Sequence, residues 1–331
     1  MKVFITGGGG FLGSYICSEL FENDEVISFS RNTYPMLESM GIKQIQGDLA
    51  YYSDVENAMR GCVAVFHVAA KAGIWGEEKE YYETNVIGTQ NIIKACQNLK
   101  VKYLIYTSSP SVIFQGKKIE GQSENDLNYP QEFLATYPKT KAMAEKMILA
   151  ANSENLKTVA LRPHLIWGPG DEHFLPRLKE KKKQNKLRLI GKGEALIDHV
   201  YVENASYAHV LALREMQKQN PKLCGKAYFI TQNNPVSVLR FVNMLLNAMG
   251  EEEVKEFIPE KTAYFIASIM EKTYRLLKIK KEPALTRFMV EQLAKSHYFD
   301  GSAAKNDFGY EPIISTQIGL DRLKNFIKNK T

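Results

Sequence analysis

Four consecutive glycines directly after the first strand-like stretch constrain this chain more than any other sequence feature. Lys2–Thr6 is a short apolar run, and a helical pattern over Phe11–Phe21 begins right after the glycines. Residues without a Cβ can turn tightly and let an anion approach the backbone, and the N–H groups at the start of the helix are free to bind it. GxGxxG and GxxGxxG registers both fit, and either predicts a pyrophosphate site. The expected contacts are Gly7, Gly8, Gly10, Phe11, Leu12 and Gly13.

Strand and helix patterns alternate along the whole first half of the chain. Strands are predicted at residues 25–30, 43–46, 64–68, 103–108 and 158–162, and helices at residues 34–40, 55–59, 81–98 and 138–152. Apolar strands separated by helices are typical of a parallel sheet covered on both faces. Because crossovers between parallel strands are right-handed, we expect an α/β fold with a doubly wound parallel sheet of the Rossmann type.

The second half of the chain has a different pattern. Strand-like pieces at residues 188–190, 198–202 and 227–231 are accompanied by helices at residues 203–217, 239–249, 262–277, 286–297 and 314–327. We therefore expect two domains, a dinucleotide-binding domain over residues 1–165 and a smaller, mostly helical substrate-binding lobe over residues 166–331. The strands near 198–202 and 227–231 are expected to return to the first sheet or to flank it.

The charge and cysteine content exclude several classes of function. The 331 residues carry 43 Lys and Arg against 37 Asp and Glu, a net charge of +6 that is modest for this length. The densest basic run, Lys179–Lys186, is typical of the solvated end of a surface helix rather than of a nucleic-acid site. The four cysteines are far apart in the sequence, so neither a disulfide framework nor a metal site is expected.

No signal peptide or membrane span is predicted. The chain starts directly with a strand-like stretch and lacks the run of about 18 apolar residues that a spanning helix needs. A cytoplasmic location follows as the expectation. The segment Thr262–Leu277 is amphipathic at helical spacing, which favours a core-facing helix, with peripheral membrane contact as the alternative.

The residues that end the second predicted strand bear on which dinucleotide is bound. An NAD site usually has an acid there, which accepts hydrogen bonds from the adenosine 2′-hydroxyl. This chain has Ser30 and Arg31 instead, and a hydroxyl beside a guanidinium suits a 2′-phosphate. NADP(H) is therefore favoured, with NAD(H) as the alternative. Asp48 and Leu49 follow the third strand, where Asp48 is expected to contact the adenine.

Tyr137 and Lys141 are four residues apart in the helix predicted after the fifth strand, so both side chains project from one face. A nearby ammonium stabilises a phenolate, which brings a tyrosine toward the range in which it exchanges a proton with a carbonyl or an alcohol. Ser109 lies at the end of the fifth strand, at the edge where such sheets bind ligands. We expect Ser109, rather than Ser108, to hold the substrate oxygen near Tyr137.

These motifs together resemble the extended short-chain dehydrogenase/reductase superfamily. The residues that carry the resemblance are Thr6–Gly13, Gly47–Leu49, Ala69, Ala70, Asn85, Ser109, Tyr137, Lys141, Arg162 and Pro163. Within the superfamily, the segments at residues 67–76, 198–204, 283–287 and 308–312 are similar to the 3β-hydroxysteroid dehydrogenase/isomerase family. The Ala-Lys-Ala-Gly-x-Trp-Gly loop at residues 70–76 is also similar to that of bacterial reductases of 2-alkyl-3-oxoalkanoates.

The resemblance implies a role for each matching residue. Tyr137 would be the general acid/base, and Lys141 would hold the nicotinamide ribose and lower the tyrosine pKa. Ser109 would orient the substrate oxygen, and Asn85 would support the site from its helix. Ala69, Ala70 and Lys71 would line the cofactor channel, and Pro163 to Leu165 would lie beside the nicotinamide.

The expected activity is hydride transfer between a nicotinamide and the carbon of a ketone or secondary alcohol. The substrate is expected to be large and apolar, such as a 3-oxo or 3β-hydroxy steroid or a β-keto acid. Candidate substrate contacts are Trp75, Ser109, Pro110 and Trp167, although ordinary packing explains both tryptophans equally well. The alternatives are a nucleotide-sugar epimerase or dehydratase on the same scaffold and an NADP-binding regulator without catalysis. A homodimer is compatible with the sequence, and no metal or nucleic-acid partner is expected.

Overall fold

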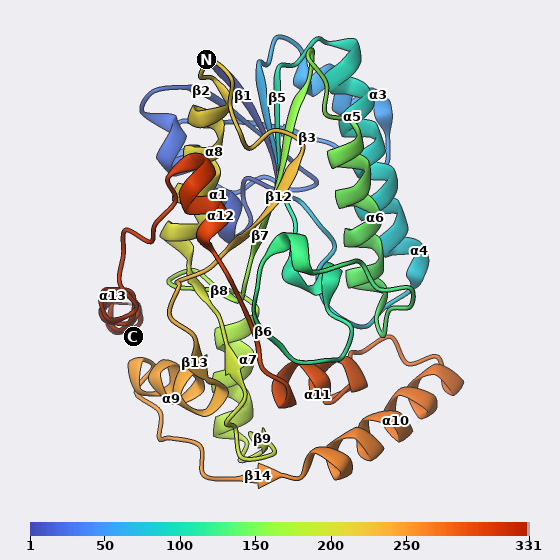
Figure 1. Cartoon of the computed structure of the whole chain (residues 1–331), viewed down its shortest axis with the longest axis vertical. Coiled ribbons are helices and arrows are strands. Elements are labelled where there is room, and N and C mark those ends of the chain that lie inside the picture. Colours follow the sequence, from blue (N-terminus) through green and yellow to red (C-terminus); the bar gives the residue numbers. More distant parts are fainter. Residues whose placement is uncertain (330–331) are drawn as a thin grey trace.

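The computed structural model describes residues 1–329, and its centre is a parallel sheet of seven strands (Figure 1). In chain order the strands are β1 (Lys2–Thr6), β2 (Glu25–Ser30), β3 (Lys43–Gln46), β4 (Ala64–His67), β5 (Tyr103–Thr107), β7 (Lys157–Pro163) and β12 (Lys226–Ile230). They lie in the order β12-β7-β5-β4-β1-β2-β3, and every neighbouring pair is parallel. The strand order reverses between β1 and β4, as in dinucleotide-binding sheets. The predicted doubly wound fold is therefore confirmed.

Helices cover both faces of this sheet. The main covering helices are α1 (Phe11–Phe21), α3 (Tyr52–Met59), α5 (Gly88–Asn98), α6 (Thr136–Ala150) and α8 (Val202–Met216). Val3 and Ile5 of β1 pack in one apolar cluster with α1 and α8, whereas Phe4 between them packs in another with α3, α5 and α6. This alternation follows from the two-residue period of a strand. Figure 1 shows the two sets of helices on opposite sides of the sheet.

The helix predicted over residues 81–98 is divided in the structure. α4 (Glu78–Tyr81) leads into a π-helical turn over Tyr82–Ile87, and α5 continues as a regular helix from Gly88. A single π turn widens the helix and reorients the side chains that it carries, and such turns are frequent at functional sites. This one carries Asn85, which is buried and bonded to the loop that follows β4.

A second, smaller sheet, in the order β13-β10-β15-β6, combines three strands of the C-terminal half with one strand of the N-terminal half. Its strands are β6 (Ile119–Gln122), β10 (Leu196–Ile197), β13 (Val236–Ser237) and β15 (His297–Phe299). Two short parallel ladders join β8 (Ile166–Trp167) to β11 (Val200–Tyr201) and β9 (Leu189–Ile190) to β14 (Phe257–Ile258). Of the late strands, β12 lies beside β7 in the main sheet, whereas β11 pairs with β8 outside it. The domain division at residue 165 stays a prediction.

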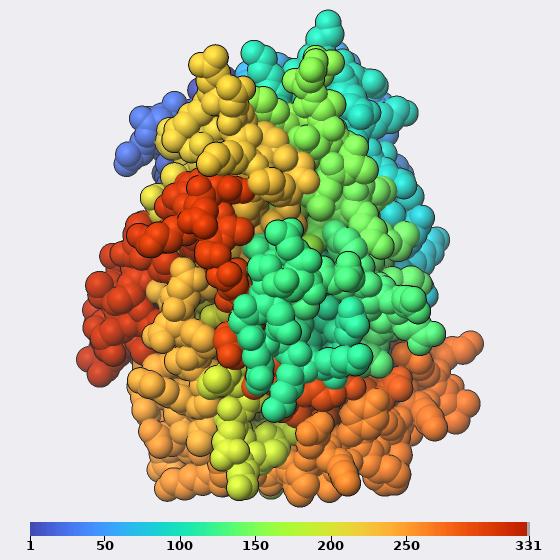
Figure 2. All heavy atoms as spheres, in the orientation of Figure 1, coloured from blue at the N-terminus to red at the C-terminus, as the bar shows by residue number. Residues whose placement is uncertain are grey.

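One predicted helix is wrong at its end. The helix predicted over residues 286–297 ends at Ala294 as α11 (Arg287–Ala294), and His297 already belongs to β15. β15 pairs in parallel with β6, a partner too distant in the sequence for local periodicity to reveal. Figure 2 shows the green residues around β6 beside the red residues that lead through β15.

The basic run that was predicted to end a surface helix lies at the end of α7 (Phe174–Lys183).

The remaining helices are α2 (Pro35–Ser39), α9 (Val238–Ala248), α10 (Glu260–Leu276), α12 (Ser302–Phe308) and α13 (Thr316–Lys328). The buried residues of α10 are Ala263, Ala267 and Glu271, so the only apolar side chains that it buries are two alanines. Phe265 and Leu276 are 65% and 83% exposed, so the predicted core-facing helix leaves most of its large apolar residues at the surface. Within residues 1–329, no helix is long and apolar enough to cross a membrane.

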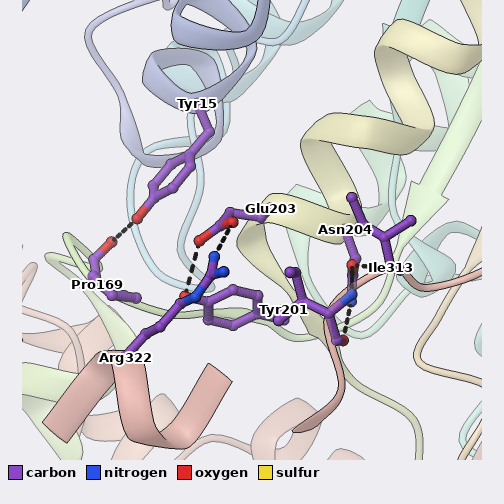
Figure 3. Close-up of polar contacts among 8 residues, drawn as sticks. Tyr15, Pro169, Tyr201, Glu203, Asn204, Ile313 and Arg322 are labelled. Carbon is purple, nitrogen blue, oxygen red and sulfur yellow. Dashed lines mark hydrogen bonds and ion pairs between the residues drawn. The ribbon is translucent and has the colours of Figure 1, made fainter. Parts of the chain in front are cut away.

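Polar contacts at the start of α8 hold the C-terminal segment against the rest of the molecule (Figure 3). Glu203 forms an ion pair with Arg322 of α13 and accepts a hydrogen bond from the hydroxyl of Tyr201. Asn204 accepts a hydrogen bond from the backbone N–H of Ile313 at 3.0 Å. Both side chains therefore serve the packing of the C-terminal helix.

Candidate active site

The glycine turn after β1 fits closely against its own backbone. Gly7 has a φ of +69°, and the N–H of Gly10 donates to the carbonyl oxygen of Gly7 at 2.9 Å. A Cβ on Gly13 would lie 2.1 Å from the same oxygen, so a larger residue does not fit. α1 starts after Gly10 without a side-chain cap or an acid in its first turn. Its first N–H groups and its dipole are therefore available to an anion such as a pyrophosphate.

A cavity of about 390 Å³, here called the dinucleotide cavity, opens in front of this turn. Most of the predicted cofactor contacts line it: Gly7, Gly10, Phe11, Leu12, Gly13, Ser30, Arg31, Asp48, Leu49, Ala69, Ala70, Lys71, Tyr137 and Lys141. Gly8, Pro163 and Leu165 are not among the lining residues, and Ile166 is. The structure thus brings the glycine turn and the Tyr137–Lys141 pair to one cavity, at the carboxyl ends of the central strands.

The ribose end of the dinucleotide cavity carries a cation. Arg31 is exposed, and the acid on which its charge acts is Glu80, which forms its ion pair with Lys71 instead. The Ser30 hydroxyl donates to the carbonyl oxygen of Asn32 at 2.7 Å. Asn32 and Tyr34 are among the lining residues that the sequence did not predict. The Tyr34 ring covers Gly9, where a Cβ would meet it at 2.0 Å, a contact between loops that no local pattern announces.

Tyr137 and Lys141 are carried by α6, as predicted. Lys141 is only 2% exposed, and its Nζ donates to the carbonyl oxygen of Thr107 at 2.6 Å and lies 4.1 Å from the centre of the Tyr106 ring. Burial lowers the pKa of Lys141 to about 7, although the charge of Glu145 opposes that change. Burial also raises the pKa of Tyr137, which a hydrogen bond with Ser109 partly offsets. The role that the resemblance implied for Lys141, lowering the pKa of Tyr137, stays a prediction.

Ser109 and Ser108 have different surroundings. Ser109 caps a short 3-10 helix over Pro110–Ile113, and its hydroxyl oxygen accepts hydrogen bonds from the N–H and the hydroxyl of Ser111 at 3.2 and 3.0 Å. Ser108, not Ser109, lines the dinucleotide cavity. The hydrogen bond between Ser109 and Tyr137 nevertheless places the Ser109 hydroxyl beside the phenol, where a substrate oxygen would need it.

Asn85 joins the loop after β4 to the helix that carries Tyr137. Its Oδ1 accepts a hydrogen bond from the N–H of Lys71 at 2.8 Å, and its Nδ2 donates to the carbonyl oxygen of Lys71 and to the Thr140 hydroxyl at 3.2 and 3.0 Å. Because Thr140 precedes Lys141, Asn85 fixes the spacing between Lys71 and Lys141 across the cavity. This geometry matches the supporting role that the resemblance implied for Asn85.

A buried ion pair that the sequence analysis missed holds α6 on the sheet. Arg162 of β7 donates to both carboxylate oxygens of Glu145 at 3.0 and 2.7 Å, and the two side chains are 5% and 0% exposed. Tyr129 donates to the same carboxylate at 2.7 Å. Glu145 lies four residues after Lys141 on α6, so the spacing that linked Tyr137 and Lys141 could have been continued to find it.

The two tryptophans have different surroundings. Trp167 is fully buried and donates to Nδ1 of His199 at 3.0 Å, so its predicted contact with a substrate is wrong and it is a core residue. Trp75 lines a second cavity of about 490 Å³, here called the outer cavity, which neither Ser109 nor Pro110 lines.

Within residues 1–329, no three His, Cys, Asp or Glu side chains are grouped so that they could hold a metal ion.

Comparison with known proteins relates the chain to one family. The model of the 3-beta hydroxysteroid dehydrogenase/isomerase family matches residues 4–259. The chain is 46% identical to the 2-alkyl-3-oxoalkanoate reductase of Shewanella oneidensis, covering 97% of this chain and 85% of the relative. It is also 46% identical to that of Stenotrophomonas maltophilia, covering 98% of each. A more distant relative is the decarboxylating sterol-4-alpha-carboxylate 3-dehydrogenase of Mus musculus, at 32% identity over 97% of this chain and 89% of the relative.

Solved structures support the fold. UDP-glucuronic acid 4-epimerase from Bacillus cereus, in complex with NAD, superposes with a TM-score of 0.77 at 24% identity, covering 100% of this chain and 99% of that chain. UDP-glucose 4-epimerase from Thermotoga maritima superposes with a TM-score of 0.77 at 21% identity, covering 100% of this chain and 99% of that chain. At this identity the likeness concerns the fold alone.

Proposed function

The chain belongs to the 3-beta hydroxysteroid dehydrogenase/isomerase family, and from that premise we propose that it uses NADPH to reduce an apolar β-keto acid to the secondary alcohol. It is an oxidoreductase of the extended short-chain dehydrogenase/reductase superfamily, acting on keto or CH–OH groups. The observation that carries the proposed NADPH-dependent reduction is the dinucleotide cavity, because the glycine turn and the Tyr137–Lys141 pair both line it. The names of the most similar relatives supply the substrate class.

The residues present fit a phosphorylated dinucleotide. The uncapped start of α1 offers N–H groups to a pyrophosphate, and the space in front of Gly13 is one that a Cβ would fill. Arg31, which lines the dinucleotide cavity, would bind a 2′-phosphate by charge-assisted hydrogen bonds. When bound, the nicotinamide supplies the hydride.

Tyr137 supplies the proton in this proposal. Burial keeps the pKa of its phenol above the ordinary tyrosine value, so Tyr137 is protonated at neutral pH and starts as a proton donor. That state suits reduction, in which the substrate oxygen takes a proton as the alcohol forms. Ser109, hydrogen-bonded to the phenol, would hold the same oxygen. Lys141 would stabilise the phenolate that remains.

The test is turnover with purified protein. A stable 2-alkyl-3-hydroxyalkanoic acid with NADP⁺, a 3β-hydroxysteroid with NADP⁺ and UDP-glucuronic acid with NAD⁺ are compared by the appearance of reduced cofactor or epimer. Oxidation of the hydroxy acid is expected, with loss of about a hundredfold or more in Tyr137→Phe, since a positioned acid or base contributes at least that factor. Tyr51→Phe, which removes the hydroxyl of a tyrosine that is 64% exposed, serves as the control. Turnover of UDP-glucuronic acid alone would instead favour the epimerase alternative.

A further inference from the structure

The outer cavity adjoins the proton-transfer site. Lys71 lines both cavities, and Thr136, which lines the outer one, directly precedes Tyr137. Its walls come from the loop after β4, from α10 and α11, and from the connection between these two helices. Figure 1 shows α10 and α11 below α4 and α6, so the outer cavity lies where the C-terminal helices meet the Rossmann sheet. Tyr137 itself lines the dinucleotide cavity, so the two cavities approach each other at Lys71 and at the start of α6.

Seven of the 18 residues that line the outer cavity have large apolar or aromatic side chains. The side chains concerned are Ile74, Trp75, Tyr81, Leu134, Tyr274, Ile279 and Phe288. A cavity of several hundred Å³ with such walls suits an alkyl chain or a flat hydrocarbon. The charged residues of the lining then decide which polar group accompanies the hydrocarbon.

Every acidic residue that lines the outer cavity is already neutralised by a cation. The ion pairs are Glu80 with Lys71 at 2.6 Å, Glu77 with Lys280 at 3.4 Å, and Glu271 with Arg287 at 2.9 Å. Glu282, close to Gly73 at the edge of the cavity, is held by Arg177 at 3.0 Å. Arg275 and Lys278 also line the cavity, and neither has an acidic partner within residues 1–329. The lining therefore carries positive charge that no acid of the described chain balances.

Arg275 is held in a defined place. Its guanidinium carbon lies 5.8 Å from the centre of the Trp75 ring, a cation–π contact. The Trp75 ring is itself fixed, because its Nε1 donates to the carbonyl oxygen of Ile279 at 3.0 Å and its edge meets Tyr274. The five N–H donors of a guanidinium match a carboxylate in a two-point hydrogen bond.

We propose that the outer cavity binds the substrate as a carboxylate, with Arg275 and Lys278 as the residues that select the anion and the apolar walls holding its alkyl chain. This inference deepens the proposed function, on which it rests for the identity of the reacting substrate. It assigns to α10 and the turn after it the discrimination between an acid and its uncharged analogue. Within residues 1–329, Lys71 is the only residue common to the linings of the two cavities.

Tryptophan fluorescence offers a direct test that needs neither cofactor nor turnover. The chain has two tryptophans, of which Trp75 lines the outer cavity and Trp167 is fully buried, so a ligand in this cavity should change the emission of Trp75 alone. The probes are myristate and its uncharged methyl ester, titrated into the full chain. Arg275→Gln and Lys278→Gln are compared with Lys272→Gln, an exposed lysine on α10 that does not line the cavity.

The wild type is expected to bind myristate more tightly than the methyl ester. Arg275→Gln is expected to weaken myristate binding about tenfold, which corresponds to the loss of one hydrogen bond to a charged group. The methyl ester should bind the wild type and Arg275→Gln alike, and Lys272→Gln should bind myristate like the wild type. A Trp75→Phe variant should lose the fluorescence change. An equal effect of Arg275→Gln on both probes, no effect on either, or no binding of myristate by the wild type would each overturn the proposal.

The two proposals fail in different ways. If the hydroxy acid is not oxidised but Arg275→Gln selectively loses myristate, the proposed reaction is wrong and the carboxylate site stands. If the hydroxy acid is oxidised with the same KM in Arg275→Gln as in the wild type, the reaction stands and the site is wrong. A carboxylate role predicts a raised KM with little change in kcat, whereas a merely structural role would lower kcat and stability together.

Discussion

Replacing Lys141 by methionine is expected to change how the stability of the cofactor-free protein depends on pH. Lys141 is 2% exposed, and burial lowers its pKa from 10.5 to about 7. Because the folded pKa is below the unfolded one, the unfolded chain binds more protons between these values, and stability from this group rises with pH across that window. Below about pH 7 both states are protonated, and the full penalty of burying the ammonium applies.

The magnitude follows from the pKa change. Each pKa unit is worth about 1.4 kcal/mol, so a fall from 10.5 to about 7 corresponds to a penalty of about 5 kcal/mol in the acid limit. From about pH 7.5 to about pH 9, the wild type should gain about 2 kcal/mol of unfolding free energy from Lys141 alone. Lys141→Met removes that gain, although it also leaves the carbonyl of Thr107 without the lysine donor.

The assay is urea unfolding of the wild type and Lys141→Met at several pH values in this range, followed by circular dichroism. Lys146→Met, an exposed lysine on the same helix, controls for the loss of a lysine as such. The difference in unfolding free energy between the wild type and Lys141→Met should shift in favour of the wild type as the pH rises. Curves that stay parallel from pH 7.5 to pH 9, within about 0.5 kcal/mol, would refute the reasoning.

Three further perturbations test separate parts of the site. Gly13→Ala places a Cβ 2.1 Å from the oxygen of Gly7 and should lower the free energy of unfolding by about 1–3 kcal/mol. In the control Gly10→Ala, the new Cβ would lie 3.2 Å from its nearest neighbour. Equal thermal unfolding of the two variants would contradict this prediction. Arg31→Gln should weaken NADPH binding about 10- to 100-fold and leave NADH unchanged, measured by fluorescence titration; equal losses for both would show that Arg31 does not read the 2′-phosphate. Arg162→Leu and Glu145→Leu should each lower the free energy of unfolding by about 3–5 kcal/mol, and the double variant should lose less than the sum of the two single losses. If urea unfolding shows that the two losses add, the two side chains are not coupled.

The parts of the fold that follow from local patterns were predicted well. β1, β2 and β3 have the predicted bounds. β1 and β2 are short, mostly apolar runs, and β3 is followed directly by Gly47. Gly13 and the start of α1 were predictable for the same reason, since a strand, glycines and a helix follow one another directly. Tyr137 and Lys141 were found from a spacing within one helix.

The parts that depend on distant pairing were not predicted. β15 lies between β10 and β6 and pairs with both, whereas within its own segment His297 continues a helical pattern. The outer cavity joins Trp75 to Arg275, two residues that no local pattern relates. Trp75 and Trp167 illustrate the same limit, because the sequence treats both alike and only packing makes one a cavity wall and the other a core residue.

Transfer of a labelled hydride is the most direct test of the central claim, that Tyr137 and an NADPH-derived hydride together convert a β-keto acid to its alcohol. The purified protein is mixed with freshly prepared 2-alkyl-3-oxoalkanoic acid and with NADPH that carries deuterium on one or the other face of the nicotinamide. Mass spectrometry of the 2-alkyl-3-hydroxyalkanoic acid should show deuterium on the carbinol carbon from one labelled form only, and Tyr137→Phe should form almost no product. Product without deuterium from either form, or product formed by Tyr137→Phe at the wild-type rate, would contradict the account.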